Sequence, residues 1–306
     1  MKRLHVAVLM GGPSAEREVS LQSGSVVVQA LLNAGTQVCE VDVRGPDFWL
    51  SSQVDVAFIA LHGTFGEDGQ IQRILEERGV PYTGSGPAAS ALAFDKSAAK
   101  SAFIAAGIPT PAHAVIERDL TPIAALSLPL VIKPARQGSS VGISIVNDRA
   151  ELQEACAQAW RYDERLIAEQ FIRGRELTVG ILGDKALPII EISTRRTFFD
   201  YQAKYTPGEA EEIVPAPLDR LTAARVQELA LRAHECLGCR DFSRVDVMLS
   251  TSGELSVLEV NTIPGLTANS LLPKAARACG LSMQDVCLRM AEMALARRDA
   301  AVPVVG

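Results

Sequence analysis

The chain has 306 residues, of which 48% are hydrophobic and 22% charged, with a formal net charge of −6. This length is enough for two or three ordinary domains, and the composition excludes a disordered, collagen-like or disulfide-scaffold protein. A mildly acidic balance argues against a general nucleic-acid binder, and no apolar run approaches the ~20 residues of a membrane span. The short apolar segment at the N-terminus predicts a buried strand rather than a signal peptide, so we expect a soluble, cytoplasmic protein.

The first third of the chain alternates predicted strands and helices. Strands are predicted at 4–10, 38–43 and 54–61, and helices at 20–34 and 68–78. This alternation indicates a mostly parallel sheet covered on both faces. The glycine-rich ends of the first and third strands, at 11–12 and 62–63, would open at the carboxyl edge of the sheet, where open α/β sheets bind ligands.

Beyond residue 87 the pattern changes to shorter strands and isolated helices. An alanine-rich helical stretch at 88–106, interrupted near Phe94 and Asp95, precedes strands at 113–117, 130–133 and 142–146, a helix at 149–160 and a strand at 165–171. Next come strands at 177–182 and 186–192, a helix at 221–237, a hairpin of strands 245–249 and 254–260, and two final helices. The stretch 193–217 between them is too long for an ordinary connection and predicts a lid or binding loop.

The six cysteines carry little functional signal. One pair, Cys236 and Cys239, has C-x-x-C spacing. A zinc site would need a second ligand pair, and none follows. The pattern favours a helix end with small buried thiols before Gly238, and scattered cysteines favour a reducing compartment.

A glycine-serine turn lies between two predicted strands, at residues 138–142 (GSSVG). Its backbone N–H groups could bind a phosphate, but it is neither a Walker A loop nor a dinucleotide fingerprint. Alone, such a segment is more often an ordinary hairpin turn. Lys133, at the end of a buried strand, could neutralise a polyphosphate beside it. Lys96 and Lys204 are candidates for the same role, although each could equally be a solvated surface lysine.

The strongest constellation lies in the predicted hairpin. Arg244 and Asp246 on one strand, and Glu259 and Asn261 on the other, share a face because each pair has i, i+2 spacing. If the turn is centred between 252 and 253, Asp246 faces Glu259 and Arg244 faces Asn261. Two carboxylates about 5 Å apart repel unless a cation lies between them, and these oxygen donors suit Mg²⁺ carried in on phosphates.

The alternative for the hairpin is a polar, solvated sheet face with an arginine salt bridge. The opposite face is expected to be buried by the intervening residues Val245, Val247, Leu258 and Val260. A register slipped by one residue would separate the two carboxylates.

Two further segments could hold substrate ions. Glu16 follows the first strand and precedes a helix, so it could fix an ammonium group, although acidic residues are common in a first helical turn. Near the C-terminus, Asn269 or Ser270 predicts a helix N-cap that could bind a carboxylate, although a plain cap needs no function.

Together these motifs resemble those of the D-alanine–D-alanine ligases, members of the ATP-grasp superfamily. The matching segments are 11–20 (GGPSAEREVS), 60–63 (ALHG), 66–69 (GEDG), 81–85 (PYTGS), 95–96 (DK), 138–142 (GSSVG), 200–205 (DYQAKY), 244–246 (RVD) and 259–262 (EVNT). The resemblance runs in order from residue 4 to about residue 295. It implies a three-domain α/β ATP-grasp fold with an N-terminal parallel α/β domain. Its parts would be a substrate-binding domain at 1–95, a central ATP-grasp subdomain at 96–178 and a C-terminal one at 179–306.

The resemblance also implies a reaction. The family joins two D-alanine molecules through an acyl phosphate, releasing ADP and phosphate, and the dipeptide enters peptidoglycan precursors. Two Mg²⁺ ions, for which Mn²⁺ can substitute, accompany ATP. The implied partners are D-alanine and ATP, with no nucleic acid or membrane, and the implied assembly is a cytoplasmic homodimer.

Residue roles follow by matching positions. The implied nucleotide-binding residues are Lys96, Lys133, Ser140, Glu169 on the adenine side, Phe171, Ile172, Glu176 at the ribose and Lys204. The implied metal ligands are Asp246, Glu259 and Asn261. The implied catalytic residues are Glu16 in a triad with Ser139 and Tyr205, and Arg244 with the Gly265 backbone at the oxyanion. The implied substrate-binding residues are Glu16, His62, Ser270 and Leu271.

The chain departs from the family pattern at 267–270 (TANS), 198–199 (FF) and 63–66 (GTFG). The first departure adjoins the expected site for the second D-alanine. Tyr205 stands where family ligases that make the ester D-alanyl-D-lactate lack a tyrosine, so we expect a dipeptide product. Other readings remain: ligation of a different carboxylate and amine, a nicotinamide-dependent oxidoreductase despite the missing fingerprint glycines, or a nucleotide-binding regulatory module without turnover.

Overall fold

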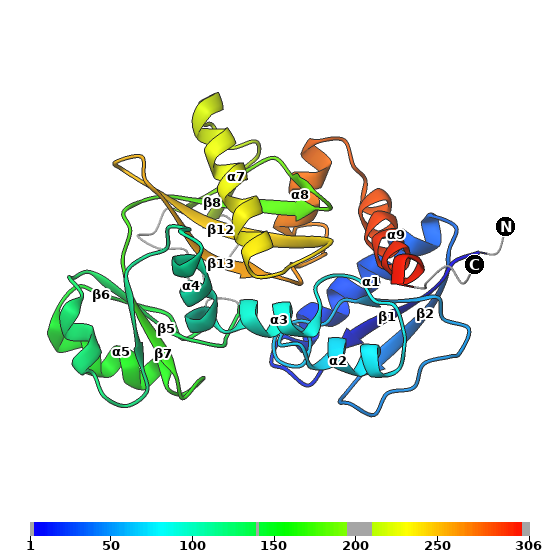
Figure 1. Ribbon diagram of the computed structural model, residues 1–306, viewed down its shortest axis with the longest axis horizontal. Helices are drawn as coiled ribbons and strands as arrows, with labels where there is room; N and C mark the ends of the chain where they lie inside the picture. Colours follow the sequence, from blue (N-terminus) through cyan, green and yellow to red (C-terminus); the bar gives the residue numbers. More distant parts are fainter. Residues whose placement is uncertain (1–2, 139–140, 195–209, 302–306) are drawn as a thin grey trace.

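The computed structural model describes residues 3–138, 141–194 and 210–301. Three sheets follow one another along the chain, each with helices packed against it (Figure 1). The first sheet is parallel and the other two are antiparallel, in agreement with the predicted α/β class. None of the helices in these residues is long and apolar enough to cross a bilayer.

The N-terminal sheet has the strand order β2-β1-β3 and separates two cores. Its elements are β1 (His5–Gly11), α1 (Arg17–Asn33), β2 (Gln37–Val43), β3 (Val56–Ile59) and α2 (Gln70–Glu77). Because side chains alternate along a strand, Val6 and Val8 pack in one core with α1, whereas Ala7 and Leu9 pack in the other with α2. The last helix, α9 (Met283–Ala301), returns to pack against α1.

The middle sheet has the order β4-β7-β5-β6. Its elements are β4 (His113–Ile116), η1 (Thr121–Ala125), β5 (Leu130–Pro134), β6 (Ser144–Val146), η2 (Arg149–Glu151), α5 (Leu152–Ala159) and β7 (Leu166–Gln170). Leu130 and Ile132 of β5 share a core with α5. Alternation therefore turns Val131 and Lys133 to the opposite face, where they line a cleft.

The third sheet has the order β11-β10-β8-β12-β13, and β9 pairs with β8. Its strands are β8 (Gly174–Leu182), β9 (Lys185–Ala186), β10 (Ile190–Thr194), β11 (Ala210–Ile213), β12 (Phe242–Ser250) and β13 (Leu255–Asn261). On one face the core contains residues of α4 (Lys96–Ala105) and α7 (Arg220–Cys236). On the other face α8 (Leu271–Ala278) packs against β8.

Helices α3 (Pro87–Phe94) and α4 connect the N-terminal sheet to the other two (Figure 1). The predicted interruption near Asp95 is confirmed. Asp95 is the N-cap of α4, and its carboxylate accepts hydrogen bonds from the N–H groups of Ser97 and Ala98. This cap fixes the direction of α4, whose first residue is Lys96.

The prediction that all of 193–217 is irregular is wrong for 193–194 and 210–213, which form strands, whereas 214–217 is irregular as predicted. β10 extends to Thr194, and β11 pairs with it in an antiparallel ladder in which Glu191 lies opposite Ile213. The sequence does not indicate this strand because two of its four residues, AEEI, are charged, which is common for a strand at a sheet edge. Residues 195–209 lie outside the described residues, and Lys204 and Tyr205 with them.

The domain boundaries remain proposals. The boundary proposed after residue 95 coincides with the break between α3 and α4. The boundary proposed after residue 178 falls inside β8, whose residues pair along one sheet with β12.

Candidate active site

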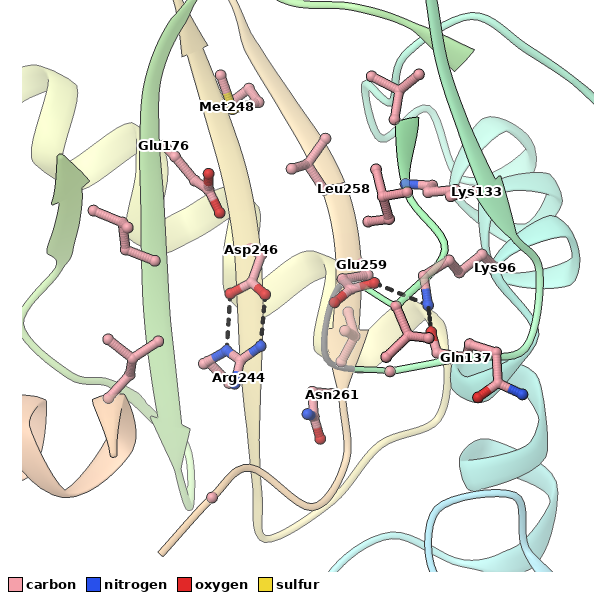
Figure 2. Close-up of a pocket in the computed structure, with 18 of the residues that line it drawn as sticks. Lys96, Lys133, Gln137, Glu176, Arg244, Asp246, Met248, Leu258, Glu259 and Asn261 are labelled. Atoms are coloured by element: carbon pink, nitrogen blue, oxygen red, sulfur yellow. Dashed lines mark hydrogen bonds and ion pairs between the residues drawn. The ribbon is translucent and has the colours of Figure 1, made fainter. Parts of the chain in front are cut away.

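A cleft of about 1360 Å³ opens between the middle and third sheets. Val131, Lys133 and Glu169 line it from the middle sheet, and Arg244 and Asp246 line it from the third. The opposite faces of the same strands are buried in the cores, so strand alternation is what directs these polar side chains into the cleft. Figure 2 shows the polar groups of the two walls facing a shared space.

The register predicted for the β12–β13 hairpin is confirmed: Arg244 pairs with Asn261, and Asp246 with Glu259. The assumed position of the turn is wrong, however. Nearer the turn Leu249 pairs with Leu255, which centres the hairpin on residue 252, and the register shifts between Asp246 and Val247. That shift inserts one extra residue in β13 and restores the predicted pairing.

The extra residue of this β-bulge is Leu258. Val257 and Val260 are buried in the core behind the sheet, but Leu258 and Glu259 both line the cleft. The prediction that Leu258 buries the opposite face is therefore wrong. A bulge breaks the strict alternation of side chains, and here it puts an apolar and an acidic side chain next to each other on one wall (Figure 2).

Asp246 is held by two neighbours at the base of the cleft. Arg244 Nε and Nη2 donate to its Oδ1 and Oδ2 at 2.9 and 2.7 Å, and Thr178 Oγ1 donates to Oδ1 at 2.6 Å. The side chains of Arg244 and Asp246 are each 11% exposed. The arginine salt bridge of the alternative prediction is thus present, but it lies within the site rather than on a solvated face.

Glu259 faces a lysine from another part of the chain. Lys96 Nζ lies 3.1 Å from Glu259 Oε2 and donates a 2.7 Å hydrogen bond to the carbonyl of Gln137 (Figure 2). Burial alone would raise the pKa of the Glu259 carboxyl, but the charges of Lys96, Lys133 and Arg244 outweigh burial and lower it. Glu259 is therefore ionised near neutral pH.

Glu169 is buried between two lysines. Lys133 Nζ lies 2.6 Å from Oε1, and Lys100 Nζ lies 2.9 Å from Oε2. Burial alone would raise the pKa of the Glu169 carboxyl, but the two positive charges lower it to about 2. Lys133 thus meets a buried carboxylate in the cleft wall.

Further predicted nucleotide-binding residues line the same cleft as Lys133 and Glu169. Phe171 and Ile172 lie in the link between β7 and β8, and Glu176 lies on β8 beside Met248 of β12; all four line the cleft. Ser140, like Ser139, lies outside the described residues. The structure brings the other members of the predicted nucleotide set, apart from Lys204, to one cavity.

The N-terminal wall of the cleft contains Glu16 and His62. Glu16 precedes α1, which begins three residues earlier than predicted. A Cβ added at Gly63 would lie 2.6 Å from Glu16 Oε2, and one added at Gly138 would lie 3.3 Å from it. The Glu16 carboxylate therefore sits between a loop of the N-terminal sheet and the glycine-serine turn.

His62 is 4% exposed and held on both ring nitrogens. Its Nε2 lies 3.0 Å from Ser23 Oγ, and its Nδ1 lies 3.4 Å from Glu67 Oε1. The predicted role of His62 in substrate binding rests on its place in the cleft wall. Glu67, which also lines the cleft, was missed because only its place in the matched GEDG segment marked it.

Ser270 is the N-cap residue of α8, as predicted, but its hydroxyl does not cap that helix. Instead Ser270 Oγ accepts a 3.0 Å hydrogen bond from the N–H of Thr267. The first N–H groups of α8 are therefore not capped by this side chain, which suits an anionic ligand. Gly265 and Leu271 also line the cleft here, and a Cβ at Gly265 would lie 2.8 Å from Ser270 Oγ.

The oxygen donors of the hairpin fit a divalent cation. Asp246 and Glu259 are carboxylates at directly paired positions of β12 and β13, and Asn261 Oδ1 accepts one hydrogen bond, from the N–H of Ile263 at 2.9 Å. Within residues 3–138, 141–194 and 210–301, no three His, Cys, Asp or Glu side chains gather as a metal-binding group. A metal ion held by Asp246, Glu259 and Asn261 could complete its coordination with phosphate oxygens, which is the way Mg²⁺ binds with nucleotides.

The C-x-x-C pair follows the simpler prediction. α7 ends at Cys236, whose Sγ donates to the carbonyl of Ala102 at 3.4 Å, and Cys239 is buried. All six cysteines are free thiols.

Comparison with known proteins agrees with these features. Residues 103–292 match the family model described as D-ala D-ala ligase C-terminus, and residues 49–85 match D-ala D-ala ligase N-terminus. A D-alanine–D-alanine ligase of Citrifermentans bemidjiense is 47% identical over 296 residues, which cover 96% of this chain and 97% of that protein.

Solved structures match over nearly the whole chain. The D-alanine–D-alanine ligase from Bacillus anthracis complexed with ATP is 31% identical, with a TM-score of 0.86 over 98% of this chain and all of that one. The VanG D-Ala:D-Ser ligase from Enterococcus faecalis is 32% identical, with a TM-score of 0.85 over 96% of this chain and all of that one. The predicted ATP-grasp fold class is confirmed by these matches, and the chain belongs to the D-alanine–D-alanine ligase family.

Proposed function

We propose that the protein catalyses the ATP-dependent joining of two D-alanine molecules to D-alanyl-D-alanine, with release of ADP and phosphate. The observation that carries the proposal is the cleft in which Lys96 and Lys133 face the Asp246–Glu259 pair. Cations suited to phosphates and carboxylates suited to a metal occupy opposite walls of one cavity. The ATP complex of the Bacillus anthracis ligase supports ATP as the nucleotide.

The reaction would proceed in two steps. The carboxylate of the first D-alanine attacks the γ-phosphorus of ATP, the bond to the β-phosphate oxygen breaks, and an acyl phosphate and ADP form. The amine of the second D-alanine, after loss of a proton, then attacks the acyl carbon. The tetrahedral intermediate collapses with loss of phosphate, leaving the peptide bond.

Each charged group of the cleft has a role in this scheme. Glu16, between Gly63 and the glycine-serine turn, would bind the ammonium of the first D-alanine, with Ser139 and Tyr205 as its proposed partners. Arg244 and the backbone of Gly265 would stabilise the oxyanion of the tetrahedral intermediate. Ser270, Leu271 and the start of α8 would bind the carboxylate of the second D-alanine.

Asp246, Glu259 and Asn261 would hold two Mg²⁺ ions, or Mn²⁺ in their place, together with the phosphates. The ions would supply positive charge that offsets the charge developing on the transferred phosphoryl group. The proposal also includes a cytoplasmic homodimer that acts in the synthesis of peptidoglycan precursors.

The experiment that tests the function is phosphate release from ATP as D-alanine is added, with the products separated by chromatography. We expect release to rise with D-alanine and not with L-alanine, and one dipeptide to form per ADP. Because the Enterococcus faecalis relative is a D-Ala:D-Ser ligase, D-serine is offered as a competing second substrate. Phosphate release that does not depend on D-alanine would contradict the proposal.

A further inference from the structure

Lys100 is a completely buried lysine next to the cleft. It follows Lys96 by one turn on α4, so the two side chains lie on one face of the helix. Whereas Lys96 reaches Glu259 of the third sheet, Lys100 reaches Glu169 of the middle sheet. One helix thus brings a lysine to a carboxylate on each wall.

The position of Lys100 is fixed from a second side. Its Nζ donates a 2.8 Å hydrogen bond to Thr110 Oγ1, and Thr110 Oγ1 donates a 2.8 Å hydrogen bond to the carbonyl of Val257, beside the β-bulge of β13. Lys100 is 0% exposed, whereas Lys133 and Glu169 line the cleft. Lys100 therefore lies behind Glu169 and does not face the cleft itself.

The charges of this cluster do not cancel. Two lysines, Lys100 and Lys133, share the single carboxylate of Glu169, so the cluster keeps one surplus positive charge. If Lys133 alone neutralised Glu169, its positive charge would be balanced by that carboxylate and would not be available to a phosphate. A buried charge without a partner is costly, so Lys133 would then be held on Glu169 and would bind a phosphate less well.

We propose that Lys100 is a positioning residue for nucleotide binding: it pairs with Glu169 on the side away from the cleft, so that Lys133 can pair with the nucleotide phosphates. The inference rests on the proposed function, because it takes ATP as the ligand of the cleft. It assigns a function to a side chain that does not touch the ligand. Packing alone would not need a lysine there, since an apolar side chain of similar length fills such a space without a desolvation cost.

The proposal predicts a pH dependence of ATP binding. Charged or titratable groups face Lys100 from four strands: Glu169 on β7, Lys133 on β5, His113 on β4 and Glu259 on β13. Burial, opposed by the charge of Glu169, lowers the pKa of Lys100 to about 8. Above that pH a neutral Lys100 would leave Glu169 to Lys133, so the Kd for ATP is expected to rise with pH in the wild-type protein and not in Lys100→Met.

The test is a titration of each variant with ATP in the absence of D-alanine. Lys100→Met is expected to raise the Kd at least about tenfold, because Lys133 would be held on Glu169 and would lose a hydrogen bond to a charged phosphate. Lys185→Met, the same change at an exposed position of β9, is the matched control and should leave the Kd unchanged.

Making Lys100→Met in a protein that already carries Glu169→Gln separates this role from a loss of folding. In Glu169→Gln the carboxylate is gone, so adding Lys100→Met should change the Kd less than twofold. This pair of variants also tests the proposal if Lys100→Met alone does not fold. An unchanged Kd in Lys100→Met, or an equal loss in both backgrounds, would overturn the inference. Failure of the wild-type protein to bind ATP would instead overturn the proposed function.

Discussion

Replacement of Glu259 by Gln tests the metal site most directly, because it removes one charge and keeps the shape. In the structure Lys96 Nζ lies 3.1 Å from Glu259 Oε2. At an effective dielectric constant of 20, an attraction at this distance is about 5 kcal/mol before desolvation is subtracted. Glu259→Gln removes this attraction and leaves Lys96 with the carbonyl of Gln137.

Two measurements on Glu259→Gln should move in opposite directions. Without metal, ATP should bind at least as tightly as to the wild-type protein, because Lys96 is released and a negative charge near the phosphates is gone. With Mg²⁺, turnover should fall by about 10³-fold, since losing one charged ligand costs on the order of 4 kcal/mol of transition-state stabilisation. Calorimetric titration with ATP and a phosphate-release assay give the two values.

A control on the same hairpin is available. Glu254 lies exposed at the turn, so Glu254→Gln makes the same chemical change away from the cleft and should leave turnover unchanged. Near wild-type turnover of Glu259→Gln at ordinary Mg²⁺ concentrations would refute the assignment of Glu259 as a metal ligand.

Three further predictions concern other parts of the site. Thr178→Val removes the 2.6 Å hydrogen bond to Asp246, so we expect turnover to fall about tenfold and the free energy of unfolding to fall by about 1 kcal/mol. Thr178→Ser should retain both the turnover and the stability. Unchanged kinetics of the valine variant would show that this bond does not position Asp246. The pKa of Glu169 lies at about 2 in the folded protein, below its ordinary value of about 4.5, so this carboxylate should contribute about 3 kcal/mol of stability above pH 4.5 and lose it as the pH falls toward 2. Urea unfolding at pH 6, 4 and 3 measures this loss, and Glu169→Gln with an equally steep pH dependence would contradict it. Offered D-alanine and D-lactate together at neutral pH, the enzyme should form the dipeptide, because a tyrosine in the role proposed for Tyr205 would add no positive charge to the pocket. Predominance of the ester in product analysis would refute that role.

The hairpin illustrates how far sequence reasoning reached. The assumed turn centre between 252 and 253 predicted the observed pairing of Asp246 with Glu259, but that centre lies half a residue away from the true one. The bulge at Leu258 corrected that displacement. Nothing local in the sequence marks such a bulge, since it depends on how β13 packs and on the bonds that Val257 makes with 109–110.

Lys100 was missed although a local signal existed. Ser97, Lys100 and Phe103 follow one another at a spacing of three and are all buried, so position 100 falls on the apolar stripe of its helix. A lysine at such a position indicates a buried partner. Its partner, Glu169, is 69 residues further along, on a strand of the middle sheet. The rest of α4 packs in the core of the third sheet, so only the tertiary structure brings Lys100 and Glu169 together.

The arrangement of α9 could not be predicted for a similar reason. Its hydrophobic residues indicate a helix that must pack against other elements, but not which of the four cores it joins. In the structure Val286 and Met290 join the core on the α1 face of the N-terminal sheet. The two ends of the chain therefore form one unit, and a substitution in the last helix is expected to destabilise the wall that carries Glu16.

The ion pairs of the cleft also bear on how a metal–nucleotide complex would enter it. Three carboxylates, Asp246, Glu259 and Glu169, are each paired with a cation before any ligand arrives. Asp246 and Glu259 would hold a metal ion that arrives with the phosphates, and Lys96 and Lys133 would bind the phosphates. Lys96 and Lys133 would each exchange a carboxylate for a phosphate, which avoids the large penalty for leaving either charge isolated in the interior. The same exchange explains why Glu169 needs a second lysine: no metal replaces Lys133 at that carboxylate, so Lys100 must already be there.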